Sequence, residues 1–335
     1  MDNSNRVHKA ALGASLYVPS THKQLLAIAN GERLSHLRSV IFCTEDAIAE
    51  RDLSYALFNL SLALQNMAEQ SDTLRFVRVR NAEVLGRVLA MPGAHKLTGF
   101  VLPKTTRHNF GSYLRQVLHT NHLLMPTLET VEVFDDNEMK RFCRLLSKPQ
   151  ARERILALRI GGNDLLALLG LRRPASGTIY QTALGPVIGR LVTTVRPHGF
   201  QLSAPVFEHL SQRAGLDAEV ALDLAHGLTA KTAIHPDQVP QIERHYQVGQ
   251  ADIELALRII DPDSPAVFRM RESMCEVATH SSWAHQIIEQ ARQFGIRRPD
   301  DNIERGVERG VEKSVVTNIE TMRPQQITDK KEARS

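Results

Sequence analysis

The chain has 335 residues and a mass of 37.5 kDa, which is enough for one large α/β barrel or for two ordinary domains. Its hydrophobic fraction of 42% and charged fraction of 23% are typical of a globular protein. No apolar stretch reaches the length of a membrane span, and the N-terminus lacks the basic and then apolar order of a signal peptide. We therefore expect a cytoplasmic protein with no membrane partner.

The charge balance and the cysteines exclude further classes. The formal charge of +4 and the pI near 9.0 raise the possibility of a nucleic-acid partner, but the excess is small, aromatic residues make up only 5%, and no nucleic-acid motif is present. The pattern favours a mildly basic enzyme that takes anionic substrates. Cys43, Cys143 and Cys275 lie far apart without metal-ligand spacing, so we expect reduced, mostly buried thiols and no structural zinc.

Strand-like apolar runs alternate with helix-like segments along the chain, as in repeated βα units on a parallel sheet. The runs are 14–19, 39–43, 74–80, 99–104, one from 123, one from 156, 199–204 and 231–236. The clearest helical segments are 23–29, 53–68, about 184–195 and 218–226. Eight such units in about 250 residues predict a closed (β/α)8 TIM barrel over residues 1–260. Dinucleotide and ATP sites lose support because G-x-G-x-x-G and Walker A sequences are absent.

The pattern changes after Ile260. Residues 261–265 read as a turn or linker, and 283–294 read as a helix that ends at Gly295. We expect 261–298 to form a helical extension, either a lid over the barrel mouth or an oligomer contact. The polar segment 299–335 predicts a flexible tail, with oligomer contacts as the alternative.

Two carboxylates follow consecutive strands of the predicted barrel. Glu129 ends the run that begins at Leu123, and Asp164 follows the run that begins at Leu156. An α/β barrel holds its active site at the carboxyl ends of its strands, and two carboxylates with open positions suit Mg²⁺, or Mn²⁺, completed by a chelating substrate. Either residue alone could be a helix N-cap or a first-turn acid. Together they favour a metal site.

Seven short motifs occur in a fixed order between residues 14 and 260. They are Leu16-Tyr17-Val18-Pro19, Cys43-Thr44-Glu45-Asp46-Ala47, Val77-Arg78-Val79-Arg80-Asn81, Val101-Leu102-Pro103-Lys104, Met125-Pro126-Thr127-Leu128-Glu129-Thr130, Gly161-Gly162-Asn163-Asp164-Leu165 and Lys231-Thr232-Ala233-Ile234-His235-Pro236-Asp237-Gln238. In order and rough spacing the set resembles the citrate lyase β-subunit and malyl-CoA lyase group of the HpcH/HpaI aldolase superfamily.

The resemblance implies a Mg²⁺ ion on Glu129 and Asp164 that chelates a 2-oxo acid such as oxaloacetate, glyoxylate or pyruvate. It also implies a third-strand arginine that holds the developing oxyanion, and assembly into a homo-oligomer, a trimer or a hexamer. The arginine is Arg78 or Arg80, because Arg-Val-Arg-Asn offers two registers for the Arg-x-Asn of the family. Alternate strand residues point the same way, so both could line the mouth.

The same resemblance assigns supporting residues. Lys104 would place a positive charge near the substrate carboxylates, with a solvated turn as the alternative. Glu45 and Asp46 match part of the family's Asp-x-Glu-Asp and could hold metal-bound water or orient Arg78. His235 could be an acid or a base, but a structural hydrogen-bonding role is favoured. Glu276 is the loose counterpart of a lid aspartate and is expected at the substrate.

Three positions depart from the family pattern. Cys43 replaces an acidic residue, Ser20 replaces a glycine, and Ala204 falls near a usual aspartate. The two acids expected to bind the metal, Glu129 and Asp164, are kept, while residues that would handle the thioester differ. This disfavours citryl-CoA as the substrate and favours an outlying branch of carbon–carbon bond lyases.

The leading hypothesis is a Mg²⁺-dependent carbon–carbon lyase or aldolase acting on a 2-oxo acid, an acyl-CoA thioester or both. The alternative is a catalytically altered barrel that binds a dicarboxylate or a CoA derivative in a regulatory role. Nucleic-acid binding ranks last.

Overall fold

A computed structural model describes residues 12–297 of the chain. These residues form two compact units that divide between Ile242 and Glu243. The segment predicted as a polar tail, residues 299–335, lies outside the described residues. No helix between residues 12 and 297 is long and apolar enough to cross a membrane.

Parallel strands form the centre of the first unit. Within the described residues the sheet has eight of them, in the order β7-β6-β5-β4-β3-β2-β1-β8. They are β1 (Ala14–Pro19), β2 (Ser39–Cys43), β3 (Leu74–Arg78), β4 (Gly99–Leu102), β5 (Leu123–Leu128), β6 (Leu158–Ile160), β7 (Leu202–Ser203) and β8 (Lys231–Ala233). A parallel bridge between Ala204 and Lys231 joins the two outer strands and closes the sheet. The predicted (β/α)8 barrel is therefore confirmed.

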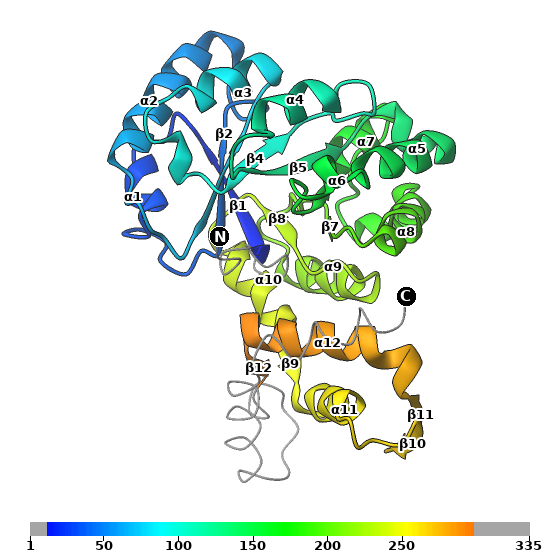
Figure 1. Cartoon of the computed structure of the whole chain (residues 1–335). Coiled ribbons are helices and arrows are strands. Elements are labelled where there is room, and N and C mark those ends of the chain that lie inside the picture. Colours follow the sequence, from blue (N-terminus) through cyan, green and yellow to red (C-terminus); the bar gives the residue numbers. More distant parts are fainter. Residues whose placement is uncertain (1–11, 298–335) are drawn as a thin grey trace. The chain divides into compact units, whose positions relative to one another are not determined.

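Helices follow the strands and surround them (Figure 1). They are α1 (Leu25–Ala29), α2 (Leu53–Asn66), α3 (Ala82–Leu89), α4 (Phe110–Val117), α5 (Asp136–Leu146), α6 (Pro149–Arg152), α7 (Gly162–Leu168), α8 (Leu184–Val195), α9 (Arg213–Ala225) and α10 (Gln238–Tyr246). Side-chain caps begin two of them: Asn81 accepts a hydrogen bond from the Val84 amide at α3, and Asp135 accepts from two amides at α5. Such caps satisfy amides that the first helical turn leaves without partners.

The barrel interior is filled by one buried apolar side chain after another from successive strands. Ile41 of β2, Phe76 of β3, Val101 of β4 and Met125 of β5 belong to one buried cluster. Ile41 pairs in register with Phe76, and Val101 pairs with Met125. This layer lies below the carboxyl ends of the strands and supports the residues that follow them.

The second unit has its own hydrophobic core. Its elements are β9 (Val248–Gly249), α11 (Gln250–Ile260), β10 (Val267–Met270), β11 (Ser273–Glu276), α12 (Val277–Phe294) and β12 (Ile296–Arg297). The α11 residues Ile253 and Ala256 pack with Ala284 and Ile288 of α12 in a separate buried cluster. Strands β10 and β11 form an antiparallel hairpin, and β9 pairs with β12 in parallel.

The unit boundary differs from the sequence expectation. The sequence places the end of the barrel at residue 260, whereas the structure groups α11 with α12 and divides the chain after Ile242. The reason is that the apolar face of α11 packs against α12. All three cysteines, in contrast, are free and buried as expected.

Candidate active site

Glu129 is the residue that follows β5, and its side chain is buried. Its Oε1 accepts hydrogen bonds from the Lys104 amide at 2.7 Å and from Arg78 Nη2 at 3.2 Å. A Cβ at position 161 would overlap the Glu129 carboxylate, so only glycine fits there. The main chain after β4 and the main chain after β6 therefore enclose this carboxylate from two sides.

Arg78 ends β3 and connects three carboxylates. Its Nε donates to Glu45 Oε2 at 2.7 Å, and its Nη2 lies 2.7 Å from Asp46 Oδ2 and 3.2 Å from Glu129 Oε1. Burial alone would lower the pKa of this guanidinium, but Tyr17 and the three acids outweigh burial and raise its pKa. Arg78 is therefore a fixed positive charge at the barrel mouth.

Lys104 contacts both Glu129 and Asp164, through its amide and its ammonium group respectively. It follows β4 with a left-handed φ of 45°, a backbone conformation that residues with a side chain rarely adopt. Its amide binds Glu129, while its Nζ lies 3.7 Å from Asp164 Oδ1 and 3.8 Å from Glu45 Oε1. Its side chain is 53% exposed, so the ammonium group faces both the carboxylates and the solvent.

Asp164 lies in the first turn of α7, as in the alternative that treats it as a first-turn acid. The helix N-cap is Gly161 and makes no side-chain cap bond, so Asp164 does not cap the helix. Its carboxylate instead faces Lys104 and is 34% exposed. The residue thus lies in the first turn of the helix and also contacts Lys104.

Two carboxyl groups of the cluster hold their protons more tightly than usual. Burial raises the pKa of Glu129 to about 7, against the opposing effect of Arg78. Burial likewise raises the pKa of Glu45, again opposed by Arg78. The charge of Asp164 also raises the pKa of Glu129, because a nearby negative charge disfavours a second one.

The donor set fits a divalent cation. Among the described residues, Glu129 Oε2 accepts no hydrogen bond, and the Asp164 carboxylate meets only the Lys104 ammonium. Mg²⁺ is usually held by one or two carboxylates and keeps its other positions for water and substrate. Within residues 12–297 no group of three His, Cys, Asp or Glu side chains is placed to share an ion, so Glu129 and Asp164 would be the protein's contribution.

Arg80 lies elsewhere than the sequence expectation places it. Its Nη2 donates to the Ile48 carbonyl at 2.7 Å, and its Nε lies 3.5 Å from the Thr44 carbonyl. Strand β3 ends at Arg78, so the strand alternation does not extend to Arg80. Arg80 holds the loop that carries Glu45 and Asp46, while Arg78 takes the place at the carboxylates.

Two further predicted residues make contacts with residues close to them in the chain. His235, on the loop after β8, is exposed, and its Nδ1 accepts a hydrogen bond from the Asp237 amide at 3.2 Å. Glu276 ends β11 in the second unit and is exposed, with Thr279 Oγ1 3.4 Å from its Oε2.

The structure adds Arg159 and Tyr17 to the site. Arg159 is 2% exposed and belongs to β6, where its Nη2 donates to Thr232 Oγ1 at 2.7 Å. The Tyr17 ring lies 5.7 Å from the Arg159 guanidinium and 6.0 Å from that of Arg78, within the range of a cation–π contact. The sequence does contain a signal that could have identified Arg159: it is a charged residue inside the apolar run Leu156-Ala157-Leu158-Arg159-Ile160.

Comparison with known proteins gives related enzymes and similar folds. The (3S)-malyl-CoA thioesterase of Cereibacter sphaeroides strain KD131 is 27% identical over 248 residues, covering 73% of this chain and 80% of the relative. CitE of Mycobacterium tuberculosis, solved with magnesium, acetoacetate and coenzyme A, superposes with a TM-score of 0.62 at 20% identity, over 84% of this chain and 99% of CitE. RipC of Yersinia pestis superposes with a TM-score of 0.57 at 19% identity, over 73% of this chain and 99% of RipC. These two structures show the same fold.

The family itself follows from a match that spans most of the chain. The model described as C-C bond lyase of the TIM-barrel fold matches residues 6–296. This range includes every strand of the barrel and the carboxylate cluster at its mouth. The chain therefore belongs to the carbon–carbon bond lyase family of the TIM-barrel fold.

Proposed function

We propose that the chain is a Mg²⁺-dependent carbon–carbon lyase that acts on a 2-oxo acid, an acyl-CoA thioester or both. The observation that carries the proposal is that Lys104 contacts Glu129 through its amide and Asp164 through its Nζ, while the buried cation Arg78 lies beside Glu129. The names of the relatives support it, since one is a malyl-CoA thioesterase and another was solved with magnesium, acetoacetate and coenzyme A.

Glu129 and Asp164 would hold the metal. Bound Mg²⁺ would supply Lewis-acid polarisation of the substrate carbonyl. Glu129 is positioned for this by the Lys104 amide and by the absence of a side chain at Gly161. Asp164 is more exposed and can adjust through its side-chain torsions.

The positive groups of the site act on the substrate's charges. The half-exposed Lys104 ammonium can bind a substrate carboxylate. Arg78 stays protonated and is held rigidly by Glu45 and Asp46, so its charge stabilises negative charge that develops on the substrate without reorganisation during the reaction. Glu45 and Asp46 are therefore positioning residues for Arg78.

The test is turnover of oxaloacetate, glyoxylate, pyruvate and acyl-CoA thioesters, with Mg²⁺ and after chelation. We expect activity only with Mg²⁺ and a loss of at least about 100-fold in Glu129→Gln and in Asp164→Asn, because each removes a ligand and its charge. Glu132→Gln is the matched control, since Glu132 lies in the 3₁₀ helix Val131–Phe134 after β5 and has no contact with the cluster among the described residues; it should keep full activity.

Near-normal turnover in either ligand variant, with an unchanged thermal midpoint, would refute the proposal. Tight binding of a dicarboxylate or a CoA derivative without any product would favour the regulatory alternative instead.

A further inference from the structure

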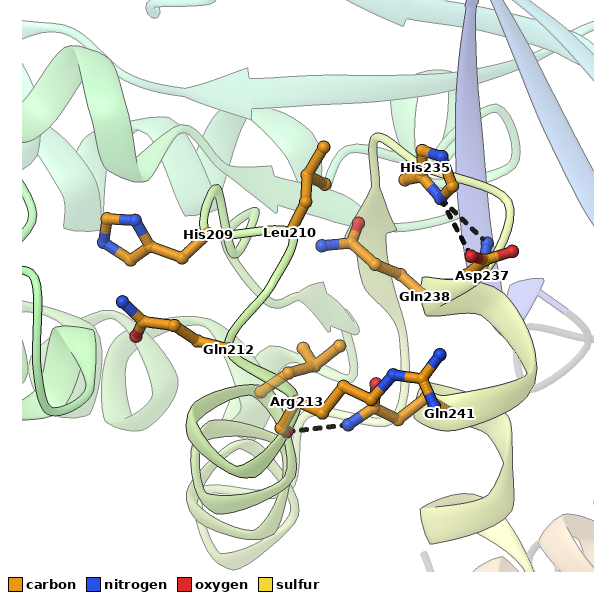
Figure 2. A pocket seen from close by; sticks show the side chains of 9 residues that line it. His209, Leu210, Gln212, Arg213, His235, Asp237, Gln238 and Gln241 are labelled. Atoms are coloured by element: carbon orange, nitrogen blue, oxygen red, sulfur yellow. Dashed lines mark hydrogen bonds and ion pairs between the residues drawn. The ribbon is translucent and has the colours of Figure 1, made fainter.

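A polar pocket of about 80 Å³ lies where the loops after β7 and β8 meet. We call it the β7–β8 pocket. Figure 2 shows His209 and Gln212 on one side, His235 and Asp237 on the other, and Arg213 with Gln241 below them. All of these residues belong to the first unit. None of them takes part in the carboxylate cluster described above.

Arg213 is the unpaired cation of this pocket. It is exposed, and among residues 12–297 its guanidinium makes no hydrogen bond or ion pair; only its backbone carbonyl is engaged, by Gln241 Nε2 at 2.7 Å. A guanidinium has five N–H donors in a planar fork that matches the oxygens of a phosphate or a carboxylate. The pocket therefore presents an anion-binding group that has no side-chain partner in the part of the chain that the structure describes.

The histidine opposite supplies a second donor. His235 Nδ1 accepts a hydrogen bond from the Asp237 amide at 3.2 Å, so the neutral ring carries its proton on Nε2. His209 Nε2 lies 3.0 Å from the Pro174 carbonyl and donates to it, which fixes the orientation of that ring. Donors thus come from two different elements, α9 and the loop after β8.

Acceptors lie beside these donors. Gln212 and Gln241 each use the amide nitrogen to donate to a backbone carbonyl, at 2.6 Å and 2.7 Å, which leaves their Oε1 atoms as acceptors. A phosphate has oxygens in several directions and can also carry a P–O–H donor, whereas a carboxylate has two oxygens in one plane and donates nothing when ionised. Donors from two sides next to amide acceptors therefore favour phosphate.

The pocket lies on the face of the barrel that holds the candidate site. Asn163, the neighbour of Asp164, donates to Glu208 Oε2 at 2.9 Å, and a Cβ on Gly162 would lie 2.8 Å from Pro205 Cβ. The loop after β7 is thus in contact with the start of α7. TIM barrels frequently bind phosphate with the loops that follow strands 7 and 8.

We propose that the β7–β8 pocket binds phosphate, either as the free ion or as the phosphoryl group of a phosphate monoester, with Arg213 as its main ligand. The proposal goes beyond the lyase activity and does not depend on it. The Asp237 carboxylate, which lies 3.7 Å from His235 Nδ1, repels a phosphate dianion. It therefore limits how strongly the pocket holds one.

The experiment is calorimetric titration of the full chain with inorganic phosphate. Arg213→Gln should weaken binding at least about tenfold, because it removes a charge-assisted contact. Arg172→Gln is the matched control: it removes the same charge from an exposed residue near the pocket that does not line it, and it should change the affinity less than about twofold. Asp237→Asn should tighten binding severalfold, because it removes the repelling carboxylate.

A parallel titration with methyl phosphate distinguishes the two sources. Tighter binding of the ester, lost in Arg213→Gln, identifies the phosphoryl group of a larger molecule; tighter binding of the free ion identifies phosphate itself. Lys104→Gln separates this pocket from the candidate active site, since it should leave phosphate binding unchanged.

Four results would overturn the proposal. They are the absence of saturable phosphate binding by the unmodified chain, wild-type affinity in Arg213→Gln, equal weakening in both arginine variants, and loss of binding in Lys104→Gln. Thermal midpoints of all variants show whether each is folded.

Discussion

At the residue scale, the Glu129 carboxylate fits because Gly161 has no side chain. A Cβ there would overlap both the carboxylate oxygen and the Cβ of Glu129. We therefore expect Gly161→Ala to weaken Mg²⁺ binding at least about tenfold and to destabilise the barrel by about 1–3 kcal/mol through overpacking. Calorimetry with Mg²⁺ and urea unfolding measure the two effects.

Gly189→Ala is the matched control for that substitution. Gly189 lies inside α8, and a Cβ there would have no heavy atom within 4 Å. Alanine is a better helix former than glycine, so the free energy of unfolding of this variant should rise by about 0.5–1 kcal/mol. Its affinity for Mg²⁺ should be unchanged. Identical behaviour of the two variants would mean that Gly161 does not shape the site.

The raised pKa of Glu129 predicts how Mg²⁺ affinity depends on pH. Burial raises this pKa to about 7, and a metal ligand must be deprotonated. Below pH 7 a proton competes with Mg²⁺, so the affinity should fall by up to about tenfold per pH unit, and above pH 7 it should level off. Titrations between pH 5.5 and 8.5 measure this; a constant affinity over that range would contradict the assignment of Glu129 as a ligand.

The metal-free protein gives the matching control on stability. Because the folded-state pKa of Glu129 lies above its ordinary value of 4.5, the protonated form favours the folded state. That contribution is complete below pH 4.5 and is lost as the pH rises through about 7. Glu129→Gln removes this part of the pH dependence.

Sequence position identified some site residues better than others. Glu129, Asp164 and Lys104 could be placed at the barrel mouth because they follow strands, and in a closed barrel such positions lie on one face. The sequence left Arg78 and Arg80 as alternatives for the third-strand arginine. Arg80 could not be placed, because a two-residue error in the end of β3 changes where the side chain points. Arg159 was not assigned to the site because a strand buried on both faces gives an apolar run without alternation. Such a run does not show which of its residues point into the barrel.

At the element scale, a buried charge cluster joins β8 to α9. Lys231 Nζ lies 3.0 Å from Glu219 Oε1 and 2.9 Å from Asp223 Oδ2, and Arg173 also binds Glu219. The side chains of all four residues are buried. The Glu219 carboxylate accepts a further bond from the Ile179 amide at 2.8 Å, so one residue connects the loop after α7, α9 and β8.

Removing Glu219 should be costly because it leaves two buried cations with one acid between them. We expect Glu219→Ala to destabilise the protein by about 3–5 kcal/mol in urea unfolding. Glu272→Ala is the control, since the ion pair of Glu272 with Arg269 is exposed and should contribute little. Equal effects of the two substitutions would show that the cluster does not hold these elements together.

The elements themselves were predicted with uneven accuracy. The first two strands, 14–19 and 39–43, have the bounds that the sequence indicates, because a proline or a polar turn ends each apolar run. The seventh is two residues long instead of six, since Gly199 adopts a left-handed φ of 76° after a 3₁₀ turn. Helix α9 begins at Arg213, five residues before the predicted start, and includes Gly215, a residue that weakens the helical pattern.

At the scale of the whole molecule, the separate cores of the two units predict separate unfolding transitions. Trp283 is the single tryptophan of the chain and packs against the core of the second unit. Its fluorescence should therefore report on that unit, whereas far-ultraviolet circular dichroism also reports on the barrel. The sequence placed α11 in the barrel because an isolated amphipathic helix does not reveal its partner.

Mg²⁺ should stabilise only the unit that contains Glu129 and Asp164, because a ligand stabilises the folded state that binds it. At a concentration of 100 times its Kd, the gain is about 2.7 kcal/mol. We expect Mg²⁺ to raise the midpoint of the unfolding transition seen by circular dichroism and to leave the midpoint seen by Trp283 fluorescence unchanged. In Glu129→Gln, Mg²⁺ should shift neither midpoint. If both transitions move together with Mg²⁺, the two units unfold as one cooperative structure, since the free energy of binding in the barrel would then also stabilise α11 and α12.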